Sequence, residues 1–315
     1  MTTEGQTQPR RRIAFMNQKG GVGKTTTTVN LAAAAAARGI PTLVVDLDPQ
    51  AHASLHLGLD PAERMDDASI YDVLLDPTDH EHAPIREAIV PVDDNLFVLP
   101  SETDLAAAEF ELADQPDRTT RLRAALETQG DRFGAVFIDC PPSLGLLTLN
   151  GLAAAGEVII PMQAHFLALQ GVGKLLETIR LLTAGERAIN PGLTVSGVVL
   201  CMHDHQAAHT REVVEDLEQF FTEAAEMPGL PWSAAKVFTP AVRRNIKLAE
   251  CPSFGQTIFQ YAPEANGAKD YAALADAVFG VSTDLTESIE PIGESLPEVH
   301  VVVSHQTHVS DESGD

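Results

Sequence analysis

Paired cysteines, long apolar runs and positive charge are missing or scarce in this 315-residue sequence. The three cysteines lie far apart and form no CxxC pair, which argues against a disulfide framework or a cysteine-rich metal site. No stretch reaches the roughly 20 apolar residues that span a bilayer, and residues 1–8 are too polar for a signal peptide. We therefore expect a soluble, cytoplasmic protein.

The shortage of positive charge has two competing interpretations. The chain holds 45 acidic residues against 21 lysines and arginines, which gives a formal charge of −24. Such a surface repels anionic partners and argues against nucleic acid. Alternatively, the host has a salt-rich cytoplasm, where acidic surfaces keep proteins soluble and charges are screened over about 3 Å at 1 M salt. Because the acidic residues are spread along the whole chain, we favour this halophilic hypothesis.

A short apolar run, residues 13–16, leads into a glycine-rich turn, residues 19–25. A turn without Cβ atoms can aim backbone N–H groups at phosphate oxygens, and the alanine-rich helix predicted next adds the positive end of its dipole. Lys24 can reach β- and γ-phosphates, and the Thr25 hydroxyl suits Mg²⁺. The predicted nucleotide-binding residues are Gly20, Gly21, Val22, Gly23, Lys24, Thr25 and Thr26.

Predicted strands alternate with predicted helices along most of the chain. This order is typical of an α/β fold with a doubly wound, mostly parallel sheet flanked by helices, which binds its ligand at the carboxyl ends of the strands. The predicted strands are residues 12–17, 42–45, 96–99, 135–138, 158–161 and 195–202, and the helices are 24–38, 69–75, 118–128, 169–182 and 207–226. We expect a flexible arm (1–10), a single domain (11–280) and an acidic, disordered tail (281–315).

Three aspartates follow predicted strands. Asp139 comes after a continuous apolar strand, the position of a Walker B aspartate that binds Mg²⁺ through water or positions Thr25. Asp46 and Asp48 stand two apart where another strand ends, so one can face the metal and the other the attacking water; alternatively, Asp46 caps a loop. Phosphoryl transfer needs mainly positioning and charge neutralisation, so slow hydrolysis is expected. The predicted metal-binding residues are Thr25, Asp48 and Asp139.

Four motifs, residues 19–25, 46–50, 139–143 and 244–255, together resemble the ParA/Soj partition ATPases. These are P-loop NTPases of the deviant Walker A (SIMIBI) type, which also includes MinD. The resemblance covers residues 12–279 and identifies that region as a ParA-type ATPase domain. It implies the cofactors ATP and Mg²⁺ and an ATP-dependent, face-to-face homodimer.

The resemblance also assigns catalytic roles. Gln18 stands where the usual P-loop pattern has glycine, and Lys19 adds a second lysine at the start of the turn. In this family that lysine reaches across to the partner's nucleotide, much as an arginine finger acts in trans. The implied catalytic residues are Lys19, Lys24 and Asp48, with Asp48 matching the aspartate that orients water.

For partners, the family implies double-stranded DNA, bound without sequence preference, and a ParB/Spo0J-like protein that stimulates slow hydrolysis. Cycling on the nucleoid would then partition chromosomes or plasmids. The predicted DNA contacts are Arg243, Arg244 and Lys247; a helix would place 243 and 247 on one face.

Two departures from the family weaken the DNA prediction. Gln206 replaces an arginine that helps bacterial Soj proteins bind DNA, with Arg211 as a candidate substitute, and Gln256 replaces a lysine. Each DNA phosphate that the protein neutralises adds about −0.9 to the slope of log K for DNA binding against log salt concentration. DNA binding through only a few contacts would therefore weaken strongly in molar salt.

The same residues bear on four other possible functions. A MinD-like membrane-cycling ATPase needs a basic amphipathic C-terminal helix, whereas residues 283–315 hold eight acidic residues and no lysine or arginine. A positioning ATPase for another cargo is not separated from partitioning by the sequence. An iron–sulfur carrier needs paired cysteines, and zinc at His203, His205 and His209 would lack cysteine ligands.

Overall fold

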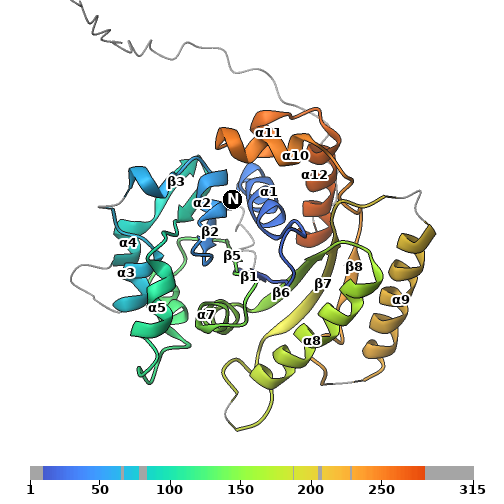
Figure 1. Ribbon diagram of the computed structural model, residues 1–315, viewed down its shortest axis with the longest axis horizontal. Helices are drawn as coiled ribbons and strands as arrows, with labels where there is room; N and C mark the ends of the chain where they lie inside the picture. The colour runs from blue at the N-terminus through green and yellow to red at the C-terminus, as the bar shows by residue number, and fades with distance from the viewer. Residues whose placement is uncertain are drawn as a thin grey trace, which may run out of the picture. The chain divides into compact units, whose positions relative to one another are not determined.

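The computed structural model describes residues 10–64, 67–77, 84–186, 188–204, 208–227 and 229–280. Of the predicted arm only Arg10 belongs to these residues, and the predicted tail lies outside them. Eight strands in the described part of the chain form one sheet in the order β3-β4-β2-β5-β1-β6-β7-β8 (Figure 1).

Every strand pair of this sheet is parallel except β3 with β4, so the predicted doubly wound, mostly parallel fold is confirmed. The central strands β2 and β5 are buried along their whole length, as continuous apolar runs require in a parallel sheet. The strands are β1 Arg11–Phe15, β2 Thr42–Asp46, β3 Val90–Asp93, β4 Leu96–Leu99, β5 Ala135–Asp139, β6 Glu157–Met162, β7 Thr194–Leu200 and β8 Lys236–Phe238.

The five predicted helices are present with shifted ends. They correspond to α1 Lys24–Ala37, α3 Ile70–Leu75, α6 Arg121–Glu127, α8 Phe166–Thr183 and α9 Ala208–Ala225. The elements that the sequence did not reveal are β3, β8, α2 His52–His56, η1 Pro61–Glu63, α4 Pro84–Ala88, α5 Leu105–Glu111, α7 Leu146–Ala154, α10 Lys247–Glu250, η2 Cys251–Phe254, α11 Ile258–Tyr261 and α12 Asn266–Phe279.

Alternation along the strands divides the core between the two faces of the sheet. Successive side chains of a strand point to opposite faces. Ile13 and Phe15 of β1 therefore pack in one cluster with α1 and α12, while Ala14 packs in the other with α7 and α8. In Figure 1, α1 and α12 lie above the central strands and α7 and α8 lie below them.

The sheet order brings the predicted motifs together. Strand β5 lies between β2 and β1, and all three are parallel. In the register, Asp139 is level with Phe15 on one side and with Asp46 on the other. The glycine-rich turn after β1 and the aspartates at the ends of β2 and β5 therefore lie side by side at the carboxyl ends of these strands, as expected for this fold.

Candidate nucleotide-binding site

The backbone of the glycine-rich turn has two positions that favour glycine. Gly21 and Gly23 adopt φ angles of +71° and +91°, which L side chains rarely reach. A Cβ on Gly23 would also come within 3.1 Å of the Cys201 Cβ, whereas Gly20 faces open space. The Gly23 carbonyl accepts a hydrogen bond from Thr27 N at 2.9 Å, which starts helix α1 directly at the turn.

One buried carboxylate organises the start of α1. Asp139 is fully buried and accepts hydrogen bonds from Thr25 Oγ1 at 2.6 Å, Thr28 Oγ1 at 3.1 Å and Lys24 Nζ at 3.4 Å. Burial lowers the pKa of Lys24, but the carboxylates of Asp139 and Asp48 outweigh burial, so its pKa is raised and the ammonium is kept. A cation, a hydroxyl and a carboxylate thus converge where phosphate and Mg²⁺ were predicted.

The two aspartates after β2 have different environments. Asp46 is fully buried, and its Oδ2 accepts hydrogen bonds from Ser54 N at 2.8 Å and Ser54 Oγ at 2.9 Å. Burial, and then the charge of Asp139, raise the pKa of Asp46 to about 7. Asp46 therefore anchors α2 to the end of β2, which is the loop-capping alternative.

Asp48 is held by its own turn, close to Lys24. Its Oδ1 accepts a hydrogen bond from Gln50 N at 3.0 Å, and its backbone carbonyl accepts one from Ser101 Oγ at 2.8 Å. Asp48 is also nearly buried, with 7% exposure. The backbone turn therefore fixes the direction of the carboxylate that was predicted to orient water.

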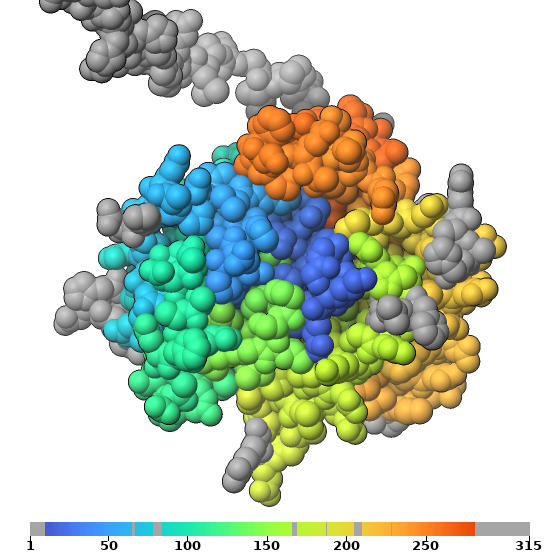
Figure 2. All heavy atoms as spheres, viewed as in Figure 1, coloured from blue at the N-terminus to red at the C-terminus, as the bar shows by residue number. Residues whose placement is uncertain are grey.

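Two pockets open beside the turn and meet at Thr26. One, of about 440 Å³, is lined mainly by apolar side chains from the end of β7 and from residues 242–249, with Tyr271 of α12. The other, of about 690 Å³, lies between α2 and η2 and includes His52 and Phe254. The first has the size and apolar walls that suit a purine base next to the phosphate site. In Figure 2 the dark-blue segment with the turn reaches the surface between light-blue, green and orange segments.

Lys19 lies at the outer edge of the turn. It is exposed, and its Nζ lies 2.5 Å from Nε2 of His165, which immediately precedes α8. Its backbone N–H donates to Asn17 Oδ1 at 3.0 Å. The two lysines of the turn therefore contact different partners: Lys24 contacts the buried Asp139, and Lys19 contacts His165.

Comparisons with known proteins decide the family. A family model described as an AAA domain matches residues 10–195. The chromosome partitioning protein ParA of Myxococcus xanthus is 42% identical over 267 residues, 84% of this chain and 86% of that protein. The sporulation initiation inhibitor protein Soj of Bacillus subtilis is 40% identical over 266 residues, 84% of this chain and 97% of that protein. This chain belongs to the ParA/Soj family of partitioning ATPases.

Solved structures with the same fold include proteins crystallised with nucleotide and magnesium. Cobyrinic acid a,c-diamide synthase from Mycobacterium smegmatis is 35% identical with a TM-score of 0.67, covering 85% of this chain and 94% of that chain, and its structures hold magnesium with ADP or an ATP analogue. The cell division ATPase MinD of Pyrococcus furiosus is 25% identical with a TM-score of 0.64, covering 86% and 99%. These findings match the predicted cofactors, ATP and Mg²⁺.

The structure corrects the geometry of the predicted DNA contacts. Arg243 lies outside any helix, because its segment runs beside the end of β7, where His203 N donates to the Val242 carbonyl at 2.9 Å. Its guanidinium binds Asp270 at 2.6 Å, and Lys247 Nζ binds Glu250 at 2.7 Å. The prediction that positions 243 and 247 share one helical face is therefore wrong.

Arg244 is the remaining member of the basic trio. It is exposed and, among the described residues, forms no ion pair. Gln206 lies outside the described residues, and Arg211 is exposed on α9. No helix in the described part of the chain has the length and apolar character needed to cross a membrane.

Proposed function

We propose that this ParA/Soj-family protein is an ATP-dependent dimerising switch that hydrolyses ATP slowly until a ParB-like partner stimulates it. In this proposal the switch partitions chromosomes or plasmids. The observation that carries it is the pairing of two unlike lysines on one turn. Lys24 is buried against Asp139, as a residue of its own nucleotide site should be, whereas Lys19 is exposed at the outer edge of the turn, where a second protomer could approach it.

In the proposed mechanism, each residue has one task. Lys24 and the backbone of the turn bind the β- and γ-phosphates, and Thr25 and Asp139 hold Mg²⁺ directly or through water. When bound, Mg²⁺ neutralises charge on the phosphates. Asp48 orients the attacking water, and Lys19 of the second protomer stabilises the charge of the leaving phosphates.

For DNA, we propose Arg244 as the main contact of each protomer. Asp270 and Glu250 compensate the charges of Arg243 and Lys247, which leaves one uncompensated cation in the trio. A dimer would carry two copies of Arg244 and could therefore contact DNA with both protomers. Because each phosphate contact adds about −0.9 to the salt slope, binding through so few contacts should be weak in molar salt.

Fluorescence anisotropy with random-sequence duplex DNA tests the proposal. The protein is titrated with ATP and with ADP, in molar KCl and in the lowest salt that keeps it folded. We expect binding only with ATP, lost in Lys24→Ala because ATP is not held and in Arg244→Glu because the charge is reversed. Lys174→Glu on α8 is the control, since it makes the same change of charge away from the trio.

Two other results would redirect the proposal. If the protein hydrolyses ATP but never binds DNA, the DNA role is wrong. The favoured function would then be a positioning ATPase that acts on a protein cargo. If it instead sediments with anionic liposomes only when ATP is present, a MinD-like membrane cycle replaces partitioning.

A further inference from the structure

We propose that His165 is a positioning residue that holds Lys19 within its own protomer and thereby sets the threshold for ATP-dependent dimerisation. The inference rests on the proposed function, in which Lys19 acts on a partner's nucleotide. In the described structure Lys19 Nζ lies 2.5 Å from His165 Nε2. Since an ammonium group is a donor only, the imidazole must be the acceptor, with Nε2 unprotonated.

The contact is one of three between residues 17–21 and the segment formed by the end of β6 and the loop after it. Asn17 Nδ2 donates to the Pro161 carbonyl at 2.8 Å, and Gln163 Nε2 donates to the Gly21 carbonyl at 3.1 Å. Together with His165, these residues connect residues 17–21 at three points to the end of β6 and the loop that follows it. The backbone of Lys19 is thus held in place, and its side chain alone has to rotate to leave His165.

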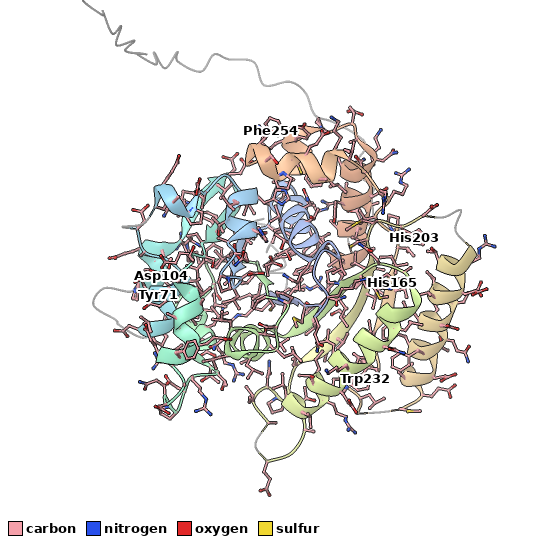
Figure 3. The ribbon with its side chains drawn as sticks, viewed as in Figure 1. Tyr71, Asp104, His165, His203, Trp232 and Phe254 are labelled. Atoms are coloured by element: carbon pink, nitrogen blue, oxygen red, sulfur yellow. The ribbon has the colours of Figure 1, made fainter. Side chains whose placement is uncertain are left out.

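Among the described residues, the His165 side chain makes no hydrogen bond other than the one to Lys19. It is the N-cap residue of α8, but its side chain makes no capping hydrogen bond to that helix. Replacing it should therefore leave α8 and the turn intact. Figure 3 shows His165 at the start of α8, on the loop that follows β6.

Dimerisation has to compete with this contact. A Lys19 that reaches a partner's phosphates must first give up His165, and each dimer breaks two such contacts. His165→Ala removes the acceptor, so the dissociation constant of the ATP-bound dimer should fall by about tenfold, which is ~1.4 kcal/mol shared by two contacts. His165→Gln offers an amide oxygen to the same ammonium and should stay close to the wild type.

His165→Glu should act in the opposite direction. A carboxylate forms a charge-assisted hydrogen bond to Lys19, which is stronger than the bond to a neutral imidazole. The dimer dissociation constant should then rise by at least about tenfold. Opposite effects of Ala and Glu, with recovery by Gln, are not expected of a residue that only supports the fold.

The experiment measures dimerisation by analytical ultracentrifugation with a non-hydrolysable ATP analogue, with nucleotide affinity determined separately. Gln170→Ala, an exposed change on α8, is the matched control. A second readout follows the reaction of Lys19 with an amine-acetylating reagent in nucleotide-free protein by mass spectrometry. Acetylation of Lys19 should become several-fold faster in His165→Ala relative to Lys174, an exposed lysine of α8.

The outcomes separate the two proposals. If wild type dimerises with the analogue but His165→Ala has the same or a higher dissociation constant, the inference about His165 is overturned. Unchanged acetylation of Lys19 would overturn it as well. If the wild-type protein binds the analogue and stays monomeric, the proposed function as a dimerising switch is wrong. The proposed role of His165 in limiting dimerisation is then wrong as well.

Discussion

At the scale of single residues, the nucleotide site depends on the hydrogen bonds that the buried carboxylate of Asp139 accepts. Asp139 has no exposure to water, and three groups from the start of α1 donate to its two oxygens. A buried carboxylate without such partners would cost several kcal/mol. The same bonds place Thr25 and Lys24, so the residue that binds α1 to β5 also prepares the site for its ligand.

Asp48 should separate binding from catalysis. In Asp48→Asn we expect ATP affinity within a few-fold of wild type, because Lys24 and Thr25 remain, and hydrolysis slower by at least about 100-fold. Single-turnover ATP hydrolysis and equilibrium nucleotide binding measure the two quantities. Asp94→Asn, an exposed carboxylate between β3 and β4, is the control. Loss of both activities together would mean that Asp48 mainly supports the nucleotide.

His56 should make stability depend on pH. Burial lowers its pKa to about 4, and an unfolded histidine titrates near 6.5. Between about 4 and 6.5 the unfolded chain binds more protons, so stability is full above about 6.5 and decreases as the pH falls, by up to about 3 kcal/mol. His56→Gln cannot titrate, so the difference between its unfolding free energy and that of wild type should vary with pH over this window. A constant difference would contradict the prediction.

At the scale of elements, the wall of the larger pocket depends on a close backbone approach between α2 and η2. A Cβ on Gly255 would lie 2.6 Å from Gly58 Cα, and the φ angle of Gly255 is +61°. Nearby, Cys251 Sγ lies 3.5 Å from His56 Nε2, so the two elements also share a buried side-chain contact. These elements come from distant parts of the chain, yet they form one side of the site together.

Gly255→Ala should therefore destabilise the protein by about 3 kcal/mol, because it adds backbone strain to a steric clash. Chemical denaturation in molar KCl measures this change. Gly171→Ala on α8 is the control: nothing lies within 4 Å of its added Cβ, so alanine should be neutral or stabilising by up to about 1 kcal/mol. Equal effects of the two changes would argue against a close approach at Gly255.

At the scale of the whole molecule, charge is the dominant feature. The formal charge is −24, and several of the few cations are already bound to carboxylates, as in the pairs Arg11–Glu157, Arg38–Asp276 and Arg243–Asp270. Repulsion among the remaining carboxylates destabilises the compact state unless salt screens it. The halophilic hypothesis therefore concerns stability as well as solubility.

We expect the free energy of unfolding to increase steadily as KCl is raised from dilute buffer to molar concentrations. Thermal unfolding followed by circular dichroism, together with ATPase activity at each salt concentration, measures this dependence. A protein that stays folded and active in dilute buffer would show that the acidic surface is not an adaptation to salt.

The outcome for individual elements shows what local sequence carries. The alanine-rich α1 and the apolar β5 were predicted close to their observed bounds, since propensity and continuous apolar runs are properties of adjacent residues. Helix α7 was missed, because seven of its nine residues are buried and it therefore shows no amphipathic period. Strand β8 has three residues, too few for a pattern.

The sequence by itself determined the chemistry of the nucleotide site: the turn, its two lysines and the aspartates at the strand ends. These are contiguous motifs, and their geometry follows from local backbone rules and from the parallel sheet. Only the tertiary structure decided which charges are free. Asp270 neutralises Arg243 across 27 positions, and His165 binds Lys19 across 146. No local pattern encodes such contacts, because they arise where the fold brings distant segments together.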